Sequence, residues 1–492
     1  MKEESMLRVM ASGSILTIIC VKITKVELSM SSADIQLLLT AIGGVIFLVA
    51  LIVSKLRFHP LLALMITSIA VGLITGMPGE KVVKSIETGA GNTLGAVGIV
   101  VALGAMLGKI LAESGITNSI AEIIINRTST KYLPWAMAGA AFVIGIPMFF
   151  EVGLVILLPL IFSVARKLDG SKSIVGSPYV YVGVPVIAAL AAMHGMVPPH
   201  PGPLTAIAAL HTNVGATMLY GFIAAIPAIV LGGPVYGAFI TSKLKVHPDE
   251  ALIDQFAATA EGQTTFHDDP PSIGISLLTA LLPAILMLLH AVAELISPKG
   301  STLEVITGFV GDPAIAMLIG VLFATGVLIF ARGGDAEKLR SSMSASVKPI
   351  ANVLLIIAGG GAFQRVLTDA KVGDAIMHLS QQFSLSPLVL GWIISMLLSV
   401  STGSATVGIV GASGLLAPLA GAGDLNVPLL ALSIGCGSLF FNYANHAGFW
   451  LVKESFGMSM SEATLTISVI QSIVSVAGLL MVLLMNFAPA LS

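Results

Sequence analysis

Long apolar stretches constrain this chain more than any other feature. Runs of roughly 18 or more residues rich in Leu, Ile, Val and Ala recur along it, and such runs are typical of membrane-spanning helices. Of its 492 residues, 56% are apolar and 10% are charged, whereas a soluble domain carries roughly 25% charged residues. The mean hydropathy is +0.98. A membrane β-barrel would show short alternating segments instead. The sequence therefore predicts an all-α polytopic membrane protein.

The apolar segments fall into two groups separated by a polar stretch. The first group lies near residues 35–53, 60–76, 93–112, 134–165, 178–197, 204–212 and 216–241, and the second near 273–296, 310–331, 350–367, 386–420, 427–441, 446–452 and 464–487. We expect four parts: an N-terminal extension (1–29), a first transmembrane repeat (30–241), an acidic central loop (242–272) and a second transmembrane repeat (273–492). The loop holds two lysines and six acidic residues, which we interpret as solvated surface. For residues 1–29 we expect an over-extended start, with Met30 as the cleaner beginning and a genuine extra segment as the alternative.

The two groups resemble each other in sequence. "GKILAESGITNSI" (108–120) aligns with "QRVLTDAKVGDAI" (364–376), and "HPLLALMITSIAVG" (59–72) aligns with "DPAIAMLIGVLFAT" (312–325). Further along, "PHPGP" faces "NHAGF", which pairs His200 with His446 and Gly202 with Gly448. Three matches in the same order predict two repeats, which we expect to be inverted. Repeats of this kind are typical of transporters that bind their substrate between the halves, near the middle of the membrane.

Each half contains two places where a membrane helix is expected to break. "HGMVPPHPGP" (194–203) and "FNYANHAGF" (441–449) interrupt otherwise apolar segments, and proline and glycine are poor helix formers. The segments 134–165 and 386–420 are too long for one crossing of about 20 residues and too short for two crossings with a loop, so each predicts a re-entrant hairpin. Non-helical backbone at membrane depth is tolerated only where it is buried in protein or lines a wet cavity. We therefore expect the four breaks to form a polar site.

Polar residues within these breaks are the candidate site residues. Glu151 is the only charged residue between Lys131 and Arg166, and an acidic residue inside a membrane is functional by default. We predict that Glu151 and His194 couple transport to protons, although a structural histidine explains His194 equally well. The predicted substrate-binding residues are Gly153, His200, Gly202, Ser401, Thr402, Ser404, Thr406, Asn442, Asn445 and His446. A Ser or Thr in a membrane helix ordinarily bonds its own i−4 carbonyl, but the crowding of hydroxyls around Gly403 favours a binding role.

Other classes of function are disfavoured. The net charge of −2 gives no reason to expect nucleic acid as a partner. The chain carries no His-Glu-x-x-His or Gly-x-Ser-x-Gly motif, so we expect no enzymatic activity. A passive channel would need a ring of symmetry-related pore residues, which a two-fold repeat with hairpins does not supply. No metal site and no cofactor are expected.

With these motifs the sequence resembles the gluconate permease family, the gluconate:proton symporters, from about Met30 onward. The segments that carry the resemblance are "HPLLAL", "GAMLGKILAESG", "FFEVGLVILLPLIF", "VPPHPGPLTAIAA", "GSATV" and "FWLVKE". The resemblance implies an elevator-type transporter in the bacterial inner membrane that imports gluconate or a similar sugar acid with a co-transported proton. It also implies a homodimer surrounded by lipid. One departure is Asn445-His446, where the family pattern leads us to expect an acidic residue in the pair before "FW".

Electrostatics supports co-transport with a cation. Importing a monoanion into a negatively charged cell costs about 2.3 kcal/mol per 100 mV, and one accompanying proton removes that cost. An ionised Glu151 would repel the substrate carboxylate, so proton and substrate binding would be coupled. Two alternatives stay open: a D-serine permease or a carrier of another small hydroxy acid or amino acid, because D-serine permeases share most of these motifs, and coupling to sodium instead of protons.

Overall fold

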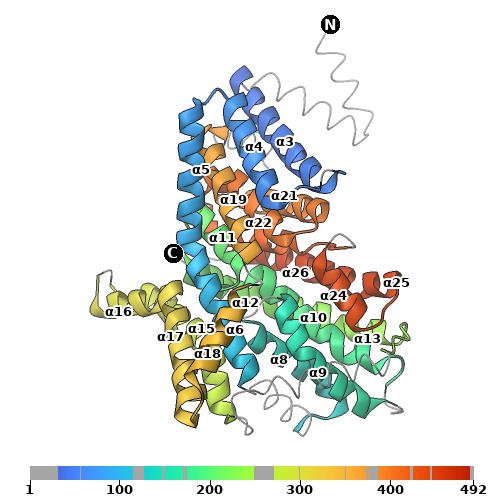
Figure 1. Cartoon of the computed structure of the whole chain (residues 1–492). Helices are drawn as coiled ribbons and strands as arrows, with labels where there is room; N and C mark the ends of the chain where they lie inside the picture. Colours follow the sequence, from blue (N-terminus) through green and yellow to red (C-terminus); the bar gives the residue numbers. More distant parts are fainter. Residues whose placement is uncertain are drawn as a thin grey trace.

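The structure is a computed structural model and is helical almost throughout (Figure 1). It describes residues 31–55, 57–114, 127–146, 150–169, 174–248, 271–298, 300–348, 351–372, 375, 386–421, 425–443 and 446–487. In the first half the α-helices are α3 (Ser32–Val53), α4 (Pro60–Ile74), α5 (Gly79–Thr93), α6 (Ile99–Glu113), α8 (Leu133–Gly145), α9 (Phe150–Leu168), α10 (Pro178–Met196), α11 (Pro201–Leu210), α12 (Val214–Val230) and α13 (Tyr236–Thr241).

The second half follows a similar order. Its α-helices are α15 (Ile273–Ile296), α16 (Thr302–Gly311), α17 (Pro313–Ala324), α18 (Ala336–Val347), α19 (Ala351–Asp369), α21 (Pro387–Thr402), α22 (Ala405–Leu416), α23 (Val427–Ser438), α24 (Ala447–Ser455), α25 (Met460–Ala463) and α26 (Val469–Met485). Short π-helical turns extend several of these helices, namely η1 (Leu94–Gly98), η3 (Leu231–Val235), η4 (Thr325–Ile329) and η8 (Thr464–Ser468).

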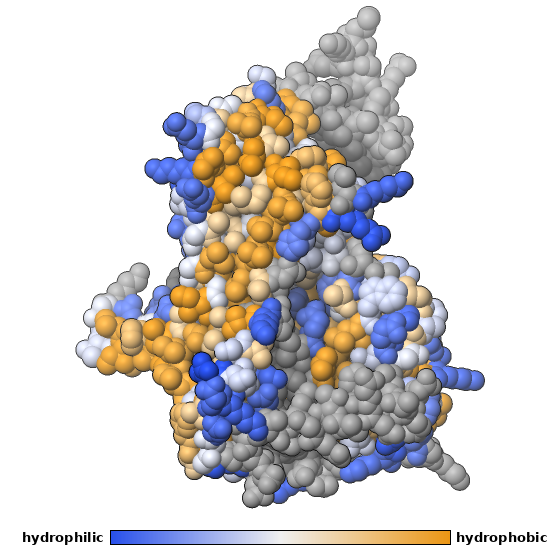
Figure 2. Space-filling model, in the orientation of Figure 1, coloured by the Kyte–Doolittle hydropathy of each residue, from blue (hydrophilic) through white to orange (hydrophobic). Residues whose placement is uncertain are grey.

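Seven helical runs within the described residues are long and apolar enough to cross a membrane. They are Ser32–Ile52, Gly79–Leu111, Pro178–Leu210, Val214–Thr241, Gly274–Glu294, Pro313–Arg332 and Met460–Met485. Exposed apolar side chains cover much of the surface. On the face shown in Figure 2, hydrophobic residues form broad patches over α4 and over α16, where Leu73, Ile74, Val305 and Phe309 are all more than half exposed. Such an apolar surface is suited to contact with lipid, as expected for the predicted all-helical polytopic membrane protein.

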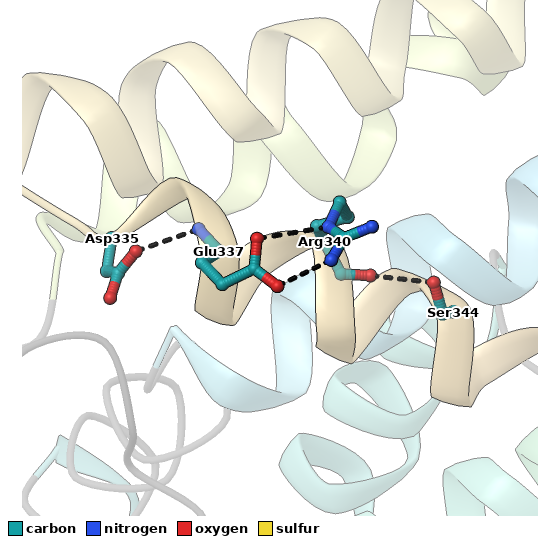
Figure 3. A network of polar contacts seen from close by, with 4 residues as sticks. All are labelled: Asp335, Glu337, Arg340 and Ser344. Atoms are coloured by element: carbon teal, nitrogen blue, oxygen red, sulfur yellow. Dashed lines mark hydrogen bonds and ion pairs between the residues drawn. The ribbon is translucent and has the colours of Figure 1, made fainter.

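Three helical regions differ from the sequence prediction. The run that we placed at 93–112 begins at Gly79, because α5 continues through η1 into α6. Its glycines and the charged residues Glu80, Lys81, Lys84 and Glu87 lower its hydropathy without preventing a helix. The helices α16 and α18 were also missed, and α18 is polar. Figure 3 shows Asp335 at its N-terminus, where a carboxylate oxygen accepts from the Glu337 N–H at 2.8 Å, and Arg340 paired with Glu337 at 2.6 and 3.1 Å.

Helices from one half pack against helices from the other in a reciprocal way. Helix α19 packs against α4 and α5, while α6 packs against α17 and α18. The α5–α19 crossing is so close that a Cβ on Gly89 would lie 2.2 Å from the Gly361 carbonyl oxygen. Small residues allow such close packing in membranes.

Two matching polar contacts connect these reciprocal crossings. On α6, Lys109 pairs with Glu113 at 2.8 Å, and the carboxylate of Glu113 accepts from the Ser342 hydroxyl at 2.5 Å. On α19, Arg365 pairs with Asp369 at 3.0 Å, and the Asp369 carboxylate accepts from the Ser85 hydroxyl at 2.7 Å. The carboxylates of Glu113 and Asp369 thus link the two halves.

Helix α10 is almost entirely buried. It packs against α8, α9, α12, α23 and α26. At its crossing with α23 the backbones meet directly, since a Cβ on Gly435 would lie 1.9 Å from the Gly195 carbonyl oxygen. This crossing places the end of α10 beside the end of α23, and both helices are followed by irregular backbone.

Candidate functional site

The first irregular segment lies between α10 and α11. Helix α10 ends at Met196 and α11 begins at Pro201, because proline at the first helical position lacks only an N–H that has no intrahelical partner. The segment brings two predicted residues together: His194 Nδ1 lies 3.1 Å from His200 Nε2, and His200 is only 4% exposed. One of these nitrogens must donate and the other accept, so a single hydrogen bond joins the two rings.

The second irregular segment precedes α24 and brings His446 to the same cluster. His446 Nδ1 accepts from the Gly448 N–H at 3.0 Å and so caps α24. Because that nitrogen accepts, Nε2 carries the hydrogen of the neutral ring. His446 interacts electrostatically with both Glu151 and His194. The two predicted proton-coupling residues thus lie around one buried histidine.

Glu151 is the second residue of α9 and is half-buried. Its neighbour Phe150 is buried, and a Cβ on Gly448 would lie 3.1 Å from the Phe150 ring. The start of α9 therefore packs against the start of α24. Gly153 lies two residues after Glu151 in α9, where an added Cβ would lie 2.8 Å from Leu190 of α10. Gly153 therefore permits close packing of α9 on α10.

The turn between α21 and α22 supplies the hydroxyl-rich segment. Gly403 ends α21 with a positive φ of 68°, which a residue with a Cβ rarely adopts. Ser404 begins α22, and its hydroxyl accepts from the Val407 N–H at 3.3 Å. The Thr402 hydroxyl donates to the Leu398 carbonyl at 2.7 Å, which is the ordinary i−4 bond of a helical threonine. Ser401 and Thr406 are both half-buried near this turn.

Ser399, one of the hydroxyl residues crowded around Gly403, connects this turn to the break before α24. The Ser399 hydroxyl lies 2.6 Å from the Ser438 carbonyl and 3.1 Å from the Asn442 side-chain oxygen. Asn442 is 1% exposed, and its amide also donates to the Ser438 carbonyl at 3.3 Å. The structure therefore uses Asn442 to hold α21 against the end of α23. Asn445, together with Pro147 in the first predicted hairpin, lies outside the described residues.

Four helices begin at these segments, namely α9, α11, α22 and α24. Helix α11 contacts α22, and a Cβ on Gly202 would lie 2.6 Å from Ile409. The N-terminus of a helix carries a partial positive charge and unpaired N–H groups, and both favour an anion. No group of three or more potential metal ligands occurs among the described residues. The helix N-termini thus suit a small anion.

A cavity of about 520 Å³ lies at the opposite end of α11 and was missed by sequence reasoning. It runs along α11 and is bounded by the end of α5, the start of α17 and the last turns of α19. Polar lining residues are Asn92, Thr93, His211, Thr212, Asp312, Gln364, Arg365 and Thr368. Four lining residues lie on one face of α19, as their helical spacing indicates: Gly361, Gln364, Arg365 and Thr368. This spacing was the sequence feature from which the lining of the cavity could have been predicted.

The chain is similar to known proteins over almost its whole length. Residues 35–488 match the family described as "GntP family permease". The chain is 40% identical to a gluconate permease of Pseudomonas aeruginosa, over 92% of this chain and 98% of that protein. It is 38% identical to a high-affinity gluconate transporter of Escherichia coli (92% and 99% covered) and 33% identical to the D-serine transporter of the same organism (88% and 95% covered).

Two solved structures are similar in fold. The YdaH transporter of Alcanivorax borkumensis superposes with a TM-score of 0.60 at 16% identity, over 88% of this chain and all of that one. The MtrF protein of Neisseria gonorrhoeae, from a class of antimetabolite efflux pumps, gives 0.61 at 13% identity, over 90% and 97%. At these identities the likeness concerns the fold alone.

Proposed function

Because the chain belongs to the GntP permease family and is a multi-pass plasma-membrane transporter rather than an enzyme, we propose that it imports gluconate or a similar sugar acid with protons. The similar gluconate permeases support the choice of substrate. The observation that carries the proposal is the cluster of Glu151, His194, His200 and His446, at which α9, α11 and α24 begin.

In this proposal the helix N-termini and the turn at Gly403 bind the substrate. The Gly202 N–H, between two prolines that have none, and the Ala447 N–H receive the carboxylate at the starts of α11 and α24, as half-helix N-termini do in other transporters. Hydroxyls of Ser401, Ser404 and Thr406 receive the polyol hydroxyls. The roles of Gly202 and Gly153 are to let backbone and helices approach closely, in keeping with the contacts to Ile409 and Leu190.

Glu151 couples the proton to the substrate. Protonation on the outside removes its negative charge beside His446, so that an anionic substrate binds without repulsion. Release of the proton inside restores the charge and favours release of the substrate. His194 and His200 form the hydrogen-bonded pair next to this group and supply a second place for the proton.

We further propose two inverted repeats that move as an elevator. The reciprocal packing of α5 on α19 and of α18 on α6, with the matching contacts of Ser85 to Asp369 and Ser342 to Glu113, supports a scaffold built from both halves. Helices α8–α9 and α21–α22 are the proposed re-entrant hairpins of the moving part. A homodimer, expected from the family resemblance, stays a prediction.

The proposal is tested by uptake into proteoliposomes that contain the purified protein. Labelled gluconate should accumulate when the outside is acidic, and preloaded unlabelled gluconate should drive labelled uptake by counterflow, which a channel cannot do. A pH shift at fixed sodium separates proton from sodium coupling.

The second candidate substrate is D-serine, favoured by 33% identity to a D-serine transporter. D-serine that competes fully with labelled gluconate, or that is transported in its place, would overturn the choice of a sugar acid.

A further inference from the structure

A second polar site is present in the cavity at the C-terminal end of α11. We propose that this cavity binds the carboxylate of the sugar acid through Arg365 before the substrate reaches the central cluster. The inference rests on the proposed function and adds to it a first binding site that the substrate occupies before the central cluster. The volume of about 520 Å³ lies within the range of roughly 300–1,000 Å³ typical of small-molecule sites.

The position of the cavity connects it to the central cluster. Its lining follows α11 from His211 back to Leu204, and Leu204 lies four residues beyond His200. At 1.5 Å of rise per residue this separation is about 6 Å, or roughly one turn of helix. The near edge of the cavity is therefore about one helical turn from His200, whereas its far edge at His211 is about 16 Å away along α11.

Arg365 is the charged group best placed to receive an anion there. Its Nε donates to the Asp369 carboxylate at 3.0 Å, and its side chain is 47% exposed. Among the described residues, no other hydrogen bond engages its guanidinium, which carries five N–H donors. Asp369 also accepts from Ser85, so one carboxylate joins Arg365 to α5, and Arg365 is one of the residues that line the cavity.

The other lining groups suit a polyol acid. Asn92, Gln364 and Thr212 offer amide and hydroxyl groups, and the Gln364 amide donates to the Ala209 carbonyl at 2.7 Å, which joins α19 to α11. Asp312 is the opposing charge in the lining. Its carboxylate accepts from the Ala314 and Ile315 N–H groups at 2.9 and 3.2 Å, so the N-terminus of α17 offsets part of that charge.

The test measures initial rates of labelled gluconate uptake in proteoliposomes at several ionic strengths. Arg365→Gln should raise KM roughly tenfold, the effect of losing a charge-assisted hydrogen bond, with Vmax nearly unchanged. The increase should shrink at high salt because the site is partly exposed. Arg365→Lys should restore part of the affinity.

Two matched variants separate binding from structure. Asp369→Asn removes the ion pair but keeps the arginine, so KM should stay the same or fall. Asp312→Asn should lower KM about two- to threefold, because it removes a repulsive charge while Asn caps a helix as well as Asp. Equal losses of Vmax in Arg365→Gln and Asp369→Asn, or an unchanged KM in both Arg365→Gln and Asp312→Asn, would overturn the site. A wild-type protein that transports no sugar acid would instead refute the proposed function itself.

Discussion

The direct backbone contact between α10 and α23 leads to a sharp prediction for Gly435→Ala. A Cβ at this position would lie 1.9 Å from the Gly195 carbonyl oxygen, whereas contacts of this kind are essentially never shorter than 3.0 Å. The two helices must therefore move apart by about 1 Å, and overpacking of a well-packed interior typically costs about 1–3 kcal/mol. We expect a loss of this size in the free energy of unfolding.

The same movement should impair transport. His194 precedes Gly195 directly, and its 3.1 Å contact with His200 leaves little room before a hydrogen bond is lost. The apparent affinity for gluconate should therefore fall along with the melting temperature of the purified protein. Differential scanning fluorimetry and uptake kinetics measure the two effects.

Gly139→Ala is the matched control. Gly139 lies in α8 with no atom within 4 Å of an added Cβ, so alanine should be neutral or slightly stabilising through its helix propensity. If Gly435→Ala were as stable as Gly139→Ala and transported with wild-type affinity, the argument that this crossing positions the histidine pair would be refuted.

Three further predictions concern hydrogen bonds. Ser399→Ala should lower the free energy of unfolding by about 1–2 kcal/mol, since it removes a donor from the buried Ser438 carbonyl; an unchanged melting temperature would contradict this role. Ser85→Ala should cost about 1 kcal/mol by removing the donor to Asp369, and thermal unfolding that matches the wild type would count against the contact. Thr402→Ala should leave gluconate KM unchanged, because its hydroxyl bonds its own helix; a large increase in KM would show that this hydroxyl contacts substrate.

The membrane class and the family were predictable from sequence, and both predictions are confirmed. Apolar length predicts that helices span the membrane, and motifs such as "VPPHPGP" are specific to the family. Proline also predicts where α11 begins, because it can occupy the first helical turn but not the interior. The broken helix at His200 could thus be placed to within a few residues.

Side-chain partners were less predictable because they depend on crossings between distant helices. Nothing local indicates that Ser399 would contact Asn442, or that Gly153 would pack against Leu190. The polar helix α18 was missed because its charges resemble those of a loop. The predicted binding residues stay a prediction, although the Thr402 hydroxyl bonds its own helix and Asn445 lies outside the described residues.

Transport by a Glu151→Gln variant in proteoliposomes tests the central claim most directly. An acidic exterior should no longer drive accumulation of labelled gluconate, because glutamine cannot bind and release a proton. Counterflow with preloaded gluconate should persist, because glutamine stays neutral beside His446 like the protonated acid. Full accumulation driven by the pH gradient in this variant would contradict the assignment of Glu151 as the coupling residue.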